Sequence, residues 1–157
     1  MADNKGKAWE ARFKEDFINS FPKGTIDRLY DPVGGYSGIH NISDFIGYNY
    51  PNIFYLECKS HKGKSFPFSA LSQYEALLSK VGIKGVRAGV ALWLIDLEKV
   101  YYLPISTVKK ILESGVKSFN PDRIDKKLYN YYEVPGEKKR VFIKCKWDFL
   151  MELEEGE

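Results

Sequence analysis

Residues 43–60, SDFIGYNYPNIFYLECKS, decide the fold of this chain. Two runs rich in apolar residues lie on either side of a Tyr-Pro-Asn turn, and this arrangement predicts a β-hairpin. Side chains alternate between the two faces of a strand, so Glu57 and Lys59 project from one face and Cys58 from the other. Charged groups in an otherwise apolar strand must pair, bind a metal or react. We therefore expect a functional site on the face that carries Glu57 and Lys59.

The other elements follow from apolar periodicity along the chain. Their order of helix, strands, helix, strands, helix predicts an α/β fold in which helices flank a central mixed β-sheet. The whole chain, residues 1–157, is expected to form one domain. We predict helices over residues 4–21, 69–80, 107–113 and 147–154, and strands over 25–30, 43–49, 53–60, 86–96, 99–103 and 140–146.

The composition narrows the class of protein. Hydrophobic residues make up 44% and charged residues 29%, as in an ordinary soluble globular domain, and the net charge is only +3. Any contact with nucleic acid must therefore come from local basic clusters. The two cysteines, Cys58 and Cys145, lie in unrelated contexts without a CxxC motif, so neither a zinc site nor a disulfide framework is indicated. The chain contains no targeting segment and no run of apolar residues long enough to span a membrane, which leads us to expect a cytoplasmic protein.

Asp44 is a second acidic residue that could act together with Glu57 and Lys59. It lies at the edge of the preceding strand, thirteen residues before Glu57. Two carboxylates on neighbouring strands can hold Mg²⁺ through oxygen ligands, and the backbone carbonyl of Cys58 could be a further ligand. Such a cation polarises a phosphate and lowers the pKa of a bound water, while a nearby lysine orients or deprotonates that water. The alternative is a structural hairpin with a surface Glu–Lys pair.

The combination of motifs resembles a known nuclease superfamily. Ser43-Asp44 followed by Glu57-Cys58-Lys59 is similar to the PD-(D/E)XK motif, with Ser in place of Pro, and the wider pattern resembles the RecU-type Holliday-junction resolvases. The resemblance covers about residues 4–113 and implies a restriction-endonuclease-like core. It includes Gly47, Lys62, Lys64, Ser65-Phe66-Pro67-Phe68, Gln73, and an Asn4-x-Gly6 step followed by Glu10.

The resemblance also implies roles for individual residues. Asp44 and Glu57 would be metal ligands, and Lys59 would be the catalytic base or the group that orients water. Glu10 would be a supporting acid, and Gln73 would lie near the metal ligands or the DNA. Basic residues near the motif would contact the DNA backbone; these are Lys5, Lys7, His61, Lys62 and Lys64.

The implied activity is a magnesium-dependent endonuclease acting on four-way or otherwise branched DNA in recombination and repair, with Mn²⁺ able to replace Mg²⁺. Paired cuts across a junction require two-fold symmetry, so we expect a homodimer. The compact chain suggests a phage-encoded enzyme. Two alternatives stay open: a nuclease of restriction, repair or nicking specificity, and a DNA-binding module that does not cleave.

Three further segments carry weaker signals. The loop Gly34–Gly38 is not a phosphate-binding P-loop and is expected to approach DNA or to cap the site. His40 is a candidate general base, or alternatively a loop residue in contact with DNA. Residues 126–140 mix tyrosines with lysines and an arginine, as single-strand binders do, although a dimer surface or a solvated turn fits equally well.

Overall fold

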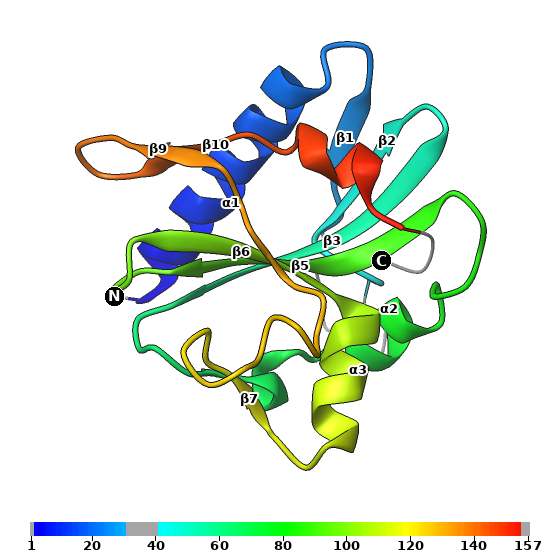
Figure 1. The fold of residues 1–157 in the computed structure, drawn as a ribbon. Helices are drawn as coiled ribbons and strands as arrows, with labels where there is room; N and C mark the ends of the chain where they lie inside the picture. Colours follow the sequence, from blue (N-terminus) through cyan, green and yellow to red (C-terminus); the bar gives the residue numbers. More distant parts are fainter. Residues whose placement is uncertain (1, 31–40, 155–157) are drawn as a thin grey trace.

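A six-stranded mixed sheet forms the centre of the computed structural model, which describes residues 2–30 and 41–154, with side chains from residue 5 onward (Figure 1). The predictions for the loop Gly34–Gly38, for His40 and for the Asn4 side chain lie outside the described residues. Only β3 and β5 pair in parallel within this sheet, and its other neighbouring strands are antiparallel. In spatial order the strands are β1 (Thr25–Arg28), β2 (Phe45–Asn49), β3 (Asn52–His61), β5 (Val86–Leu94), β6 (Lys99–Pro104) and β8 (Tyr132–Glu133).

Helices cover both faces of the sheet. The long helix α1 (Ala2–Ser20) lies across one face, and α2 (Tyr74–Leu78) and α3 (Ile105–Glu113) lie on the other (Figure 1). This arrangement confirms the predicted α/β class with a central mixed sheet flanked by helices. Among the described residues, no helix is both long and apolar enough to cross a membrane.

Aromatic residues build the core between α1 and the sheet. A stripe along one side of the helix, ending at Phe21, is buried against Phe54 of β3 and its neighbours. Cys58 belongs to this core, as its place on the inward face of the strand predicts. The helix approaches the sheet closely at Gly47, where an added Cβ would lie 2.8 Å from the ring of Phe17. Gly47 therefore sets how closely α1 can pack.

A second core lies between the sheet and the helices α2 and α3, and here one prediction is wrong. Instead of one helix over residues 69–80, the chain forms a short 3₁₀ helix, Phe68–Ala70, and then α2. Leu71 leaves the helical backbone with φ −90° and ψ 82°. Both Leu71 and Leu77 are buried in this core. The break in the helix at Leu71 thus goes together with the burial of both leucines against the sheet.

The C-terminal segment packs back onto α1. Its elements are shorter than predicted, because residues 140–146 contain only β10 (Ile143–Cys145), paired with β9 (Gly136–Lys138), and the predicted helix over 147–154 is a 3₁₀ helix, Asp148–Glu152. The buried Asp16 carboxylate accepts the N–H of Cys145 at 2.9 Å, and the hydroxyl of Ser20 accepts the N–H of Trp147 at 2.8 Å. Two short strands, β4 (Phe66–Pro67) and β7 (Ser118–Phe119), pair beside the second core.

Candidate active site

Asp44 and Glu57 face each other where β2 begins and β3 runs past it. The antiparallel register pairs Phe45 with Leu56, which places Asp44 opposite Glu57. The N–H of Asp44 donates to Oε1 of Glu57 at 2.9 Å, and the N–H of Cys58 donates to Oδ2 of Asp44 at 2.9 Å. Backbone groups therefore hold both carboxylates in place, so the structure brings together the two acids that the sequence predicts.

Burial changes the proton affinity of this pair. Glu57 is only 1% exposed. Removal from water, followed by the charge of Asp44 and a hydrogen bond between the two carboxyl groups, raises the pKa of Glu57 to about 8, against an opposing influence from Lys59. Near neutral pH the pair therefore holds a proton that two exposed carboxylates would release. A cation bound between them would take the place of that proton.

Arg28 completes the cluster and is the residue that sequence analysis missed. Its guanidinium donates to both carboxylate oxygens of Glu10, at 3.0 and 3.2 Å, and lies 3.5 Å from Oδ1 of Asp44. The side chains of Arg28, Glu10 and Asp44 are 21%, 27% and 18% exposed. Glu10 thus reaches the site through Arg28, from α1 to β1. Nothing in the run TIDR around Arg28 distinguishes it from an ordinary charged residue in a strand.

Lys59 lies on the same face of β3 as Glu57. Its charge works to lower the pKa of Glu57, so the ammonium group lies within electrostatic reach of the carboxylate. The Lys59 side chain is half-buried. Gln73 immediately precedes α2, and its amide oxygen accepts a hydrogen bond from Ser72 at 2.6 Å. Among the described residues, Gln73 has no hydrogen bond to the site carboxylates, and its role stays a prediction.

The predicted DNA-contacting residues occupy two segments. Lys5 and Lys7 are exposed in the first turns of α1, ahead of Glu10 on the same helix. Lys62 and Lys64 are exposed in the loop that follows β3. His61 ends β3, and its ring packs edge-on against Phe66 with 5.9 Å between centroids. The four lysines are exposed to solvent, and the contact of these residues with DNA stays a prediction.

The donor set fits a hard divalent cation. Within the described part of the chain, no group of three or more His, Cys, Asp or Glu side chains forms a metal-ligating cluster. Mg²⁺ does not require one, because it keeps several waters and commonly binds through one or two carboxylates. The N–H and C=O of a residue in an antiparallel strand point to the same side. The carbonyl of Cys58 therefore faces the Asp44 side, as its N–H does.

Comparison with known proteins finds a likeness among solved structures. The chain matches no protein-family model and no curated protein. Among solved structures, it is similar to Hjc, a Holliday junction resolvase from the archaeal hyperthermophile Archaeoglobus fulgidus. The identity is 23% and the TM-score 0.47, and the alignment covers 76% of this chain and 90% of that chain.

Proposed function

We propose that the protein is a metal-dependent endodeoxyribonuclease with a restriction-endonuclease-like core, and that it hydrolyses phosphodiester bonds in four-way or otherwise branched DNA. One observation carries the proposal: the carboxylates of Asp44 and the buried Glu57 face each other across β2 and β3, and Lys59 lies on the same face of β3 as Glu57. A purely structural surface pair would not require a glutamate that is 1% exposed with a pKa of about 8.

Asp44, Glu57 and the carbonyl of Cys58 are the groups that would hold the cation, Mg²⁺ or Mn²⁺. When bound, the cation supplies Lewis-acid polarisation of the scissile phosphate and a lowered pKa for a bound water. Arg28 holds Asp44 through Oδ1, the carboxylate oxygen that does not accept the N–H of Cys58. Glu10 in turn fixes Arg28 through two hydrogen bonds, so it supports the site without being a ligand.

Lys59 is the group that handles the attacking water. Its ammonium group can orient that water toward phosphorus, and its neutral form can accept the proton as the new P–O bond forms and the bond to the leaving oxygen breaks. Basic residues in α1 and in the loop after β3 hold flanking phosphates and position the scissile bond. Cutting both strands of a junction symmetrically calls for two copies of the site, and therefore for a homodimer.

The test compares cleavage of a synthetic four-way junction, a matched duplex and a single strand, with Mg²⁺ or with EDTA. We expect symmetric nicks on the junction with Mg²⁺ and none with EDTA. Lys59→Ala should lower the cleavage rate by roughly 10²- to 10⁴-fold, the contribution of a positioned proton-transfer group. Lys109→Ala, which removes an exposed lysine of α3, is the matched control and should cleave as the wild type does.

Three results would revise the proposal in different ways. Cleavage of linear duplex in place of the junction would keep the site and discard the branched substrate. Retention of activity in Asp44→Asn, Glu57→Gln and Lys59→Ala alike would show that the site is wrongly assigned. Tight DNA binding without any cleavage would favour a DNA-binding module that does not cleave.

A further inference from the structure

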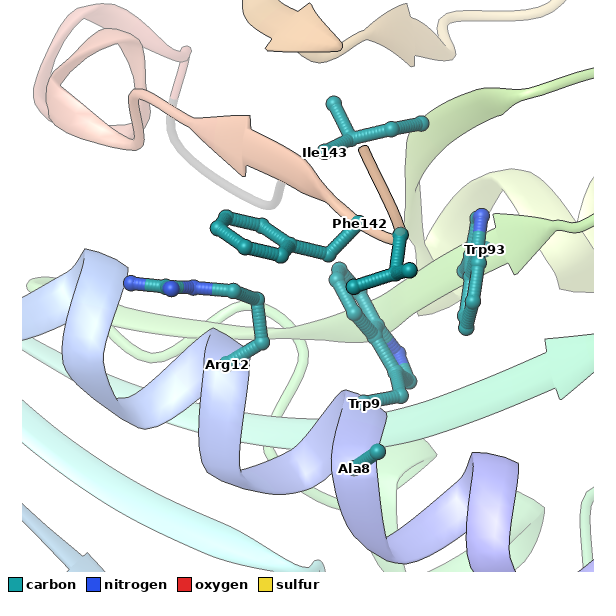
Figure 2. A pocket seen from close by; sticks show the side chains of 7 residues that line it. Ala8, Trp9, Arg12, Trp93, Phe142 and Ile143 are labelled. Carbon is teal, nitrogen blue, oxygen red and sulfur yellow. The ribbon is translucent and has the colours of Figure 1, made fainter. Parts of the chain in front are cut away.

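A groove opens on the α1 face of the sheet, away from the acid pair. It lies between the first turns of α1, the end of β5 and the β9–β10 hairpin, and its volume is about 500 Å³. A smaller recess of about 40 Å³ continues beneath the hairpin, and Trp9, Trp93 and Phe142 are among the residues that line it (Figure 2). The rings of Trp9 and Trp93 lie 6.0 Å apart, and Trp93 is only half-buried. Trp93 and Phe142, both partly exposed, line the groove, so its floor is aromatic and open to a ligand.

The rim of the groove is positively charged. Lys5 of α1 and both Lys138 and Arg140 of the hairpin line it, and Glu98 is the one acidic side chain among its lining residues. Glu98 is already paired with Lys138. In the part of the chain that the structure describes, neither Lys5 nor Arg140 has a carboxylate within ion-pair distance. Two unpaired cations thus flank the aromatic floor.

A further cation, Arg12, lies below the rim. The guanidinium of Arg12 stacks over the ring of Phe142, 4.5 Å from its centroid, and is held by Asp16 and Glu15. Its Nε is buried without a hydrogen-bond partner in the described structure. Arg12 therefore supports the ring of Phe142 from within the recess by a cation–π contact.

We infer that this groove binds unpaired nucleotides of a DNA strand, with a base on the aromatic floor and its phosphates at the cationic rim. Aromatic rings beside basic residues are the combination by which proteins hold single strands. A base stacked and paired inside a duplex cannot enter a concave groove, so the ligand is an unpaired segment. The unpaired cations favour a polyanion over an apolar peptide.

The position of the groove links it to the proposed nuclease site, and the inference rests on that proposed function. The parallel register places Trp93 beside Ser60, one residue beyond Lys59. Ser60 and Lys59 point to opposite faces of β3. The groove and the acid pair therefore lie on opposite faces near the same ends of β3 and β5, so one branch of a substrate can occupy each.

The test measures binding of a fluorescein-labelled oligothymidylate of about 15 nucleotides, near the upper limit of common single-strand site sizes. Fluorescence anisotropy is recorded in EDTA so that no cleavage occurs. Trp93→Leu keeps an apolar side chain but removes the stacking surface, and we expect binding to weaken roughly 5- to 150-fold. Circular dichroism and urea unfolding establish that the variant is folded.

Charge reversals on the hairpin provide a matched pair. Arg140→Glu changes an exposed cation at the groove, whereas Lys144→Glu changes an exposed cation of β10 that does not line it. Both alter the net charge equally, so any difference between them reports position. We expect Arg140→Glu to weaken oligothymidylate binding at least tenfold more than Lys144→Glu does.

Equal weakening by Arg140→Glu and Lys144→Glu would overturn the inference, since only the general charge would then matter. Unchanged binding by Trp93→Leu would overturn it too. Val141 is an exposed apolar residue that lines the groove. A wild-type dimer that Val141→Asp converts to a monomer with unaltered oligothymidylate binding would assign the groove to a second copy of the chain. If the wild type cleaves branched DNA in these cases, the proposed function survives; if it binds no DNA at all, the proposed function fails as well.

Discussion

Replacing Glu57 by glutamine should change how the stability of the metal-free protein depends on pH. The pKa of Glu57 is about 8 in the folded protein, against a usual value of 4.5. Between these values the folded state holds a proton that the unfolded state has released, so stability falls as pH rises through this window. The loss is roughly 1.4 kcal/mol for each pH unit. Because glutamine does not titrate, the free energy of unfolding of Glu57→Gln relative to wild type should rise by roughly 2 kcal/mol from pH 6 to pH 8.

Urea unfolding in EDTA at the two pH values measures this difference. Glu113→Gln, at the exposed end of α3, is the matched control and should leave the pH dependence of the wild type unchanged. Adding Mg²⁺ at pH 8 should stabilise the wild type and leave Glu57→Gln little changed, because a cation replaces the shared proton only where both carboxylates remain. Parallel pH profiles for wild type and Glu57→Gln would refute a buried, proton-sharing pair.

Three further substitutions test the ion-pair cluster and the packing of the fold. Arg28→Met should lower the free energy of unfolding by roughly 1.5–3 kcal/mol, because its two carboxylate partners lose their charged donor; urea unfolding measures this, and an unchanged midpoint would contradict the ion-pair geometry. Gly89→Ala should cost roughly 1–3 kcal/mol, since the added Cβ would lie 2.5 Å from the ring of Tyr102. In thermal unfolding it should contrast with Gly6→Ala in α1, where nothing lies within 4 Å and alanine should stabilise by roughly 0.5–1 kcal/mol.

The acid pair could be predicted because its signal is local. Alternation along one strand puts Glu57 and Lys59 on one face, and the short hairpin turn fixes the register that brings Asp44 opposite. Arg28 could not be predicted in the same way. Its hydrogen-bond partners Glu10 and Asp44 lie 18 and 16 residues away, and the cluster exists only once β1 pairs with β2 and α1 covers them.

The C-terminal third resisted prediction for a related reason. Strands β7 and β8 are two residues long, so neither can show the alternation by which a strand is recognised. Pairing with β4 and β6 creates them. At the last predicted helix, the buried residues Trp147 and Leu150 are three residues apart. A 3₁₀ helix satisfies this spacing as well as an α-helix does.

The contact between α1 and β10 has a consequence for folding during synthesis on the ribosome. Asp16 and Cys145 are joined across 129 residues of chain. At about 5–20 residues per second, a ribosome needs roughly 6–25 s to add those residues after Asp16 has been made. During that time the aromatic stripe of α1 lacks the C-terminal part of its cover, and the Asp16 carboxylate lacks its backbone donor. This core can therefore be completed only after Cys145 has been made, and until then α1 can pack only against the part of the sheet already synthesised.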